Sequence, residues 1–150
     1  SGSIPNSAEI VVAAEAAQVH AAWFSQYPDL YHEKTAALIK RGQAVKAASL
    51  EAALAGREIL RQELSAAMAA EGLDLWLSPP APGAAPSGLA STGDPVMNLP
   101  WTHAGLPTMS LPAGFNRHGL PMGLQITGHW YGDEALVAAA VLLEETLQRG

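Results

Sequence analysis

The chain contains no cysteine, few aromatic residues and few charges. Without cysteine it forms neither a disulfide nor a thiolate nucleophile, and this absence is compatible with a cytoplasmic location. Lys and Arg number 8 against 14 Asp and Glu, which gives a net charge of −6. Because no basic stripe exists, we expect no binding to nucleic acid. No uninterrupted run of about 18 apolar residues occurs, so we expect no membrane association.

Apolar residues, in contrast, make up 49% of the 150 residues, and charged residues only 15%. This length and composition favour a globular domain with a sizeable buried core. Ser1-Gly2-Ser3 has the composition of an expression-tag remainder, so we expect the domain to span residues 4–150.

The first part of the domain, residues 6–72, is rich in alanine and predicts helices. Asn6 and Glu9 have the spacing of a capping box at the start of the first helix. One face of that helix is predicted to carry its larger apolar side chains, namely Val12, Ala16, Val19 and Trp23.

Two further helices are predicted before residue 73. The first follows Tyr27-Pro28-Asp29 and is expected to end at Lys40-Arg41-Gly42, with Gly42 as the C′ glycine. The second spans about residues 46–71, and Arg57 and Arg61 interrupt its apolar stripe. The residues of this stripe are Leu50, Ala53, Leu54, Leu60, Leu64, Ala67 and Met68. The stems of the two arginines can cover apolar surface while the heads reach water, or one of them can pair with a buried acid, either Asp74 or an acid on a part of the protein outside this chain.

The second part, residues 73–148, predicts strands, a loop, a hairpin and a helix. Strands are expected at residues 74–78, 108–111 and 122–127, the last buried on both faces. The connection between the last two is too short for a crossover helix, so it predicts an antiparallel hairpin.

Several residues of this part have expected structural roles. Asp94 and Pro95 predict the start of a short helical turn after the loop at residues 79–93. Gln125 lies inside a buried strand, so its amide is expected to tie the sheet to a neighbouring loop. The final helix is predicted over residues 135–148.

Catalytic and metal-binding patterns are scarce. No serine stands in a nucleophile-elbow sequence, and no histidine spacing predicts a metal site. His103 and His129 flank the strands and are the two histidines of functional interest. Residues 87–93 have the composition of an anion-binding loop but lack the P-loop lysine, and a plain flexible loop is the simpler interpretation.

Residues 98–128 carry a long pattern of fixed spacing: P-W-T-x-x-G-L-P-x-x-S-L-P-A-G followed by G-L-P-x-G-L-Q-I-x-G. This pattern resembles the C-terminal part of the amidase signature family, whose members hydrolyse or transfer carboxamide groups. The resemblance covers residues 4–148 and is strongest from Asp74 onward. It implies a mixed α/β fold in which helices pack on a short mixed sheet.

The same resemblance implies that the family's catalytic serines and lysine lie upstream of the matched region. We therefore expect no catalytic residue, cofactor or metal ligand in this chain. It also implies a role in the substrate channel, for which the residues leading into the hairpin are the candidates: Asp94, Met97, Asn98, Trp101 and Thr102. For Trp101 and Asn98 the alternatives are core packing and turn capping.

Two classes of function remain open. In the first, the chain is the C-terminal portion of an amidase, inactive alone, whose partners are the N-terminal part of the enzyme and a small-molecule amide. In the second, it is a stand-alone binding or interaction domain derived from that fold. As an isolated chain it is expected to form a homo-oligomer, because open strand edges and apolar surface favour association.

Overall fold

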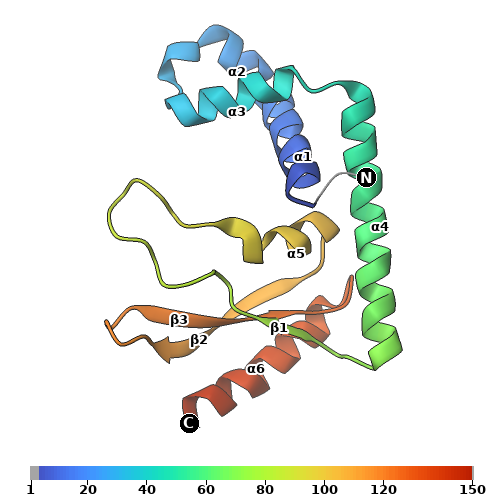
Figure 1. Ribbon diagram of the computed structural model, residues 1–150, viewed down its shortest axis with the longest axis vertical. Coiled ribbons are helices and arrows are strands. Elements are labelled where there is room, and N and C mark those ends of the chain that lie inside the picture. Colours follow the sequence, from blue (N-terminus) through green and yellow to red (C-terminus); the bar gives the residue numbers. More distant parts are fainter. Residues whose placement is uncertain (1–3, 150) are drawn as a thin grey trace. The chain divides into compact units, whose positions relative to one another are not determined.

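The computed structural model describes residues 4–149, so the expected tag remainder, Ser1 to Ser3, lies outside the described residues. The chain divides into two units, residues 1–58 and 59–150, and the boundary falls inside helix α4 (Ala47–Glu71) (Figure 1). Each unit holds its own cluster of buried apolar side chains.

The first unit is helical. It contains α1 (Ile4–Val19), α2 (Ala21–Gln26), the 3₁₀ turn η1 (Pro28–Leu30), α3 (Glu33–Gln43) and the start of α4. Phe24, Ile39 and Ala17 form its core, and the ring of Tyr31 meets the ring of Phe24 edge-on at 5.2 Å. Between α1 and α2, half-buried His20 bonds the Tyr31 hydroxyl through Nδ1 at 3.0 Å. These contacts join α1, α2 and α3 around one aromatic cluster.

The predicted apolar face of the first helix is wrong. Val12, Val19 and Trp23 are 52%, 69% and 60% exposed, while the smaller Ala13 and Ala17 are buried. The helical repeat cannot extend through Trp23, because the chain interrupts its helix at His20. The capping position is also wrong, since α1 already includes Asn6.

Gly42 is a second correction. It does not terminate α3, which continues to Gln43 with Ala44 as its C-cap, and it is buried. A Cβ atom at this position would overlap the carbonyl oxygen of Ala13 and lie 2.8 Å from Cβ of Ala17. Glycine is needed here because the backbones of α1 and α3 pass too close together for any side chain.

The second unit holds the sheet. After the end of α4 come β1 (Trp76–Ser78), η2 (Pro95–Met97), α5 (Leu99–Ala104), β2 (Thr108–Phe115), β3 (Pro121–Thr127) and α6 (Asp133–Arg149). The strand order is β1-β3-β2, and both pairings are antiparallel, with Ser110 and Ser78 each opposite Gln125. The expected mixed α/β fold and the hairpin are confirmed. The sheet, expected to be mixed, is wholly antiparallel within residues 4–149.

The turn between β2 and β3 uses the expected chemistry. Asn116 Oδ1 accepts hydrogen bonds from the backbone N–H groups of His118 and Leu120 at 2.9 and 3.0 Å. Gly119 takes a φ of +75°, the left-handed region that favours glycine. The side chain of Asn116 thus replaces the missing backbone partners at the hairpin tip.

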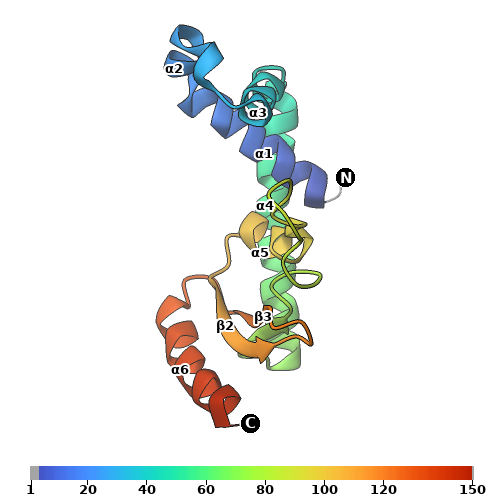
Figure 2. The same ribbon diagram turned by 90° about the vertical axis from the view of Figure 1, so that its left-hand side faces the viewer.

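Two layers flank the sheet (Figure 2). On one face, Leu111 and Ile126 of the sheet pack against Leu136 and Ala140 of α6. The opposite face, which carries Gln125, looks toward η2 and α5. The second unit is therefore layered in the order short helix, sheet and long helix.

Strand bounds and burial differ from expectation. β1 begins at Trp76 rather than residue 74, and β2 continues to Phe115 rather than ending at residue 111. β3 is buried only in its second half, because Met122 at its start is 36% exposed while Ile126 and Thr127 are 0% exposed. α6 covers the part of the strand that packs on Leu136, and the hairpin end extends beyond this cover.

The long helix α4 agrees with the predicted bounds, and Ala53 and Met68 of its expected stripe are buried. Leu54, by contrast, is 41% exposed. Within residues 4–149 no helix combines the length and apolar character needed to cross a membrane.

The packing of α1 on α3 gives a first prediction. Gly42→Ala should lower the free energy of unfolding by about 3 kcal/mol, because the added methyl group meets backbone and cannot rotate away. Chemical denaturation monitored by circular dichroism measures this loss. Gly56→Ala in α4 is the matched control: its Cβ meets only Ser7 Oγ, at 3.9 Å, so helix propensity should leave stability unchanged or higher by about 0.5–1 kcal/mol. Equal effects of the two changes would contradict the close-packing explanation.

Candidate functional site

Gln125 occupies the centre of the sheet face that looks toward η2 and α5. Its side chain is 2% exposed, and its Nε2 donates to Ser78 Oγ at 3.1 Å and to the Met97 carbonyl at 3.2 Å. One buried amide thus joins β3 to β1 and to η2. The expected tie between the sheet and a neighbouring loop is confirmed.

The segment around η2 is held by two more side chains. Asp94 Oδ1 accepts a hydrogen bond from Val96 N at 2.9 Å, and Pro95 occupies the first turn, as the sequence predicts. One turn further on, Asn98 Nδ2 donates to the carbonyl of Pro80 at 3.1 Å. This bond fastens the start of the long loop to the turn that leads into α5.

A first hollow of about 660 Å³ lies beside this loop. It is lined by residues 79–86, residues 92–95, Asn98 and residues 121–123. Its walls are mostly proline, alanine and glycine, and Asp94 is the only ionisable side chain among the described residues that line it.

A second hollow, of about 480 Å³, lies between the sheet and α5. Its lining comprises Pro80, Asn98, Trp101, Thr102, Gln125, Leu106 and residues 108–110. Pro80 and Asn98 line both hollows, so the two adjoin at the hydrogen bond between these residues.

Four of the five predicted site residues line the hollows. Asp94 lines the first, Asn98 both, and Trp101 and Thr102 the second. Met97 lines neither, and its backbone carbonyl instead accepts the hydrogen bond from Gln125. The structure thus places four of the five predicted residues around the two adjoining hollows.

Sequence reasoning missed Pro80 and Ser110. Ser110 could have been found from strand periodicity, because it lies opposite Gln125 and Thr108 lies opposite Thr127, all on the same face of the sheet. Pro80 carried no such signal, since its place in the lining depends on the long loop folding back onto Asn98.

Trp101 has a mixed environment. It is half-buried, lines the second hollow, and packs against Trp76 with ring centroids 6.1 Å apart and a tilt of 33°. The indole N–H groups of both tryptophans are buried and find no acceptor among residues 4–149. Because an unpaired buried donor carries a desolvation cost of about 1–3 kcal/mol, this pair is an unusual feature of the site.

Arg61 of α4 contacts the C-terminal end of α5. Its Nε donates to the carbonyl of Ala104 at 2.7 Å, and its Cζ lies 4.2 Å from the ring centroid of Trp130. Neither alternative for this arginine, a head that reaches water or a buried acid as partner, predicted these two contacts with a backbone carbonyl and an aromatic ring.

Ionisable groups that could act as a base are absent from the described linings of both hollows, apart from the Asp94 carboxylate that caps η2. His103 is buried in α5, and His129 Nε2 lies 3.1 Å from the carbonyl of Leu73. Within residues 4–149 no cluster of His, Cys, Asp or Glu is suited to a metal ion. The arrangement can bind and orient a ligand that has an apolar body and neutral polar groups.

Comparison with known proteins gives the family. The sequence pattern of the family Amidase matches residues 4–137. The A subunit of the glutamyl-tRNA(Gln) amidotransferase of Methylorubrum extorquens is 40% identical over 101 residues, which cover 62% of this chain and 20% of that protein. Its counterpart from Cyanothece sp. is 35% identical over 96 residues, or 59% of this chain and 20% of that protein. The matches span about a fifth of the length of these curated relatives.

Solved structures agree. A crystal structure of an amidase superposes with a TM-score of 0.84 at 28% identity, covering 95% of this chain and 35% of that one. A bacterial aryl acylamidase superposes with a TM-score of 0.71 at 18% identity, covering 97% of this chain and 34% of that one, which shows likeness of fold. The family pattern covers nearly all of the described residues, and we conclude that this chain belongs to the amidase family.

Proposed function

We propose that this chain is the C-terminal portion of an amidase, where it forms part of the channel for the acyl group of a carboxamide substrate. The observation that carries the proposal is the pair of adjoining hollows in a chain of the amidase family. Hydrolysis and transfer of an amide nitrogen both begin with binding of the acyl group, so the proposal holds for either reaction.

The chemistry of the linings supports this assignment. The first hollow has apolar, conformationally stiff walls because prolines 79, 80, 82 and 86 contribute to it. The second offers an indole face from Trp101 and neutral polar groups from Thr102, Ser110 and Asn98. Apolar walls with a few fixed polar groups are typical of small-molecule sites.

We also propose that the chain supplies no catalytic group. Ser110 is the only serine that lines either hollow among the described residues, and neither lining includes a histidine or lysine. A serine needs such a base within hydrogen-bond reach to become a nucleophile. The lysines of the chain, Lys34, Lys40 and Lys46, all belong to the first unit.

The purified chain should therefore show no turnover of aryl or aliphatic amides. Ammonia release from benzamide and acetamide, followed with a coupled assay, measures this. The proposal fails if turnover survives purification and disappears in Ser110→Ala but persists in Ser25→Ala, the control at an exposed serine of α2.

Trp101 provides a test of the channel in an active enzyme that contains this chain. Trp101→Phe keeps a ring against Trp76 and removes an indole N–H without an acceptor, so the melting temperature should change little. The order of preference among aryl and alkyl amides should change, because the indole forms part of the hollow wall. Trp23→Phe, at a residue 60% exposed in the first unit, is the control. An unchanged preference in Trp101→Phe, with kcat/KM equal to that of the control for every amide, would contradict the channel assignment.

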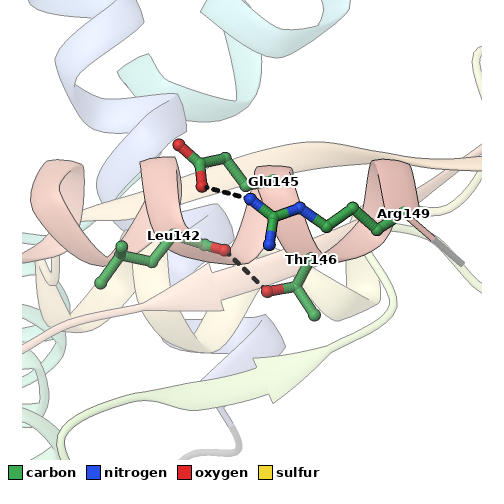
Figure 3. Close-up of polar contacts among 4 residues, drawn as sticks. All are labelled: Leu142, Glu145, Thr146 and Arg149. Atoms are coloured by element: carbon green, nitrogen blue, oxygen red, sulfur yellow. Dashed lines mark hydrogen bonds and ion pairs between the residues drawn. The ribbon is translucent and has the colours of Figure 1, made fainter.

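We propose further that the isolated chain self-associates. β1 and β2 are the edges of the sheet among the described residues, and α6 exposes Val137, Val141 and Leu142 at 50%, 54% and 67%. The last turns of α6 carry polar contacts, in which Arg149 pairs with Glu145 and Thr146 donates to the Leu142 carbonyl (Figure 3). In the complete enzyme, the rest of the protein would cover this exposed apolar surface. In the isolated chain, a second copy of the chain would cover it.

Sedimentation over a dilution series should show a dimer that dissociates on dilution. Leu142→Glu should shift the equilibrium toward monomer, because it places a charge on the exposed apolar face. Leu30→Glu, at a residue 82% exposed in the first unit, should not. A monomer at every concentration would contradict self-association.

A further inference from the structure

We propose that Arg61 is a positioning residue for the second hollow: it holds the C-terminal end of α5, and through α5 it sets the places of Trp101 and Thr102. The proposal rests on the proposed function only in so far as the hollow binds an amide. The contacts of Arg61 themselves are independent of that assignment.

The first contact is a hydrogen bond to a helix end. Ala104 is the last residue of α5 and is 0% exposed, and its carbonyl belongs to the last turn, where helical partners run out. The N–H groups of Gly105 and Leu106 bond instead to the carbonyls of Thr102 and Trp101. Arg61 Nε supplies the donor for Ala104 at 2.7 Å, a short charge-assisted bond to a buried carbonyl.

The second contact fixes the turn that follows. Gly105 has a φ of +71°, and a Cβ placed on it would lie 3.3 Å from Nη2 of Arg61. The guanidinium therefore lies against the left-handed turn that leads from α5 into β2. A larger residue at 105 would meet both the strained backbone angle and the arginine.

The third contact holds the guanidinium itself. Its Cζ lies 4.2 Å from the centroid of the Trp130 ring, and Trp130 stacks on Tyr131 with centroids 4.4 Å apart. Tyr131 has a φ of +58°, uncommon for a residue other than glycine. A planar guanidinium can stack on a ring and donate in its own plane at once, which an ammonium group cannot do.

These contacts connect three separate segments of the second unit: α4, the turn after α5, and the loop between β3 and α6. α5 has six residues, so its end lies close to the residues that face the hollow. We expect a displacement of Ala104 to reach Trp101 and Thr102, because Gly105 and Leu106, which follow Ala104, donate their N–H groups to the carbonyls of Thr102 and Trp101.

The indole N–H signals of the four tryptophans test this in the ¹⁵N-labelled chain, after assignment with single Trp→Phe variants. Arg61→Lys keeps the positive charge but loses the planar guanidinium group. The signals of Trp130 and Trp101 should both shift, and that of Trp23 in the first unit should stay in place. Arg149→Lys, which alters an exposed ion pair, should move none of the three. Movement of Trp130 without Trp101 would overturn the proposal.

A titration with benzamide adds a functional readout. Arg61→Lys should weaken its binding about five- to tenfold, at the lower end of usual coupling between sites. Unchanged affinity together with an unmoved Trp101 signal would overturn the proposal. If benzamide leaves the Trp101 signal of the unaltered chain in place, the amide-binding function fails, and the indole comparison still decides the role of Arg61.

Trp130→Leu covers the case in which Arg61→Lys does not fold. It removes the ring under the guanidinium, and Trp130 itself lies outside α5 and the hollow lining. The proposal requires the Trp101 signal to shift in this variant, and a signal identical to that of the unaltered chain would overturn it.

Discussion

The arrangement of the second unit depends on the hydrogen bonds of one buried side-chain amide, that of Gln125. Gln125 lies on the central strand at 2% exposure, where an unpaired amide would cost about 1–3 kcal/mol for each unsatisfied group. It meets this need with the Ser78 hydroxyl on one side and the Met97 carbonyl on the other. The same bonds therefore fix β1 and the turn η2 against the sheet. Asn98 and Trp101, which line the second hollow, follow directly after η2 in the chain.

Hydrogen bonds at the margins of the two hollows hold the long loop and α5, the segments that enclose them. Asn98 binds the long loop through the carbonyl of Pro80, and Arg61 binds the end of α5 through the carbonyl of Ala104. Gly123 allows the loop to come close to the sheet, since a Cβ there would lie 2.9 Å from Cγ of Pro80. Fixed margins leave the interior free for a ligand, which is the property required of a substrate channel.

Local chemistry made much of this fold predictable from the sequence. Prolines and glycines around the strands predicted the hairpin, Asp94 before Pro95 predicted η2, and an amide within a buried strand predicted the bridge made by Gln125. The errors concern tertiary contacts. Gly42 looked like a helix end, yet it is the point where α1 touches α3, and nothing local distinguishes the two roles. Pro80 and Arg61 gained their places from chain segments that are distant in sequence.

The central claim, that the second hollow receives the acyl group of an amide, is tested most directly by photo-crosslinking. A benzamide that carries a diazirine on its ring, applied to the chain with and without excess benzamide, labels whatever surrounds the acyl group, and mass spectrometry locates the label. We predict competed labelling within residues 98–110, which contribute Asn98, Trp101, Thr102 and Ser110 to the lining. Labelling confined to the first unit or to α6, or labelling that excess benzamide leaves undiminished, would contradict this claim.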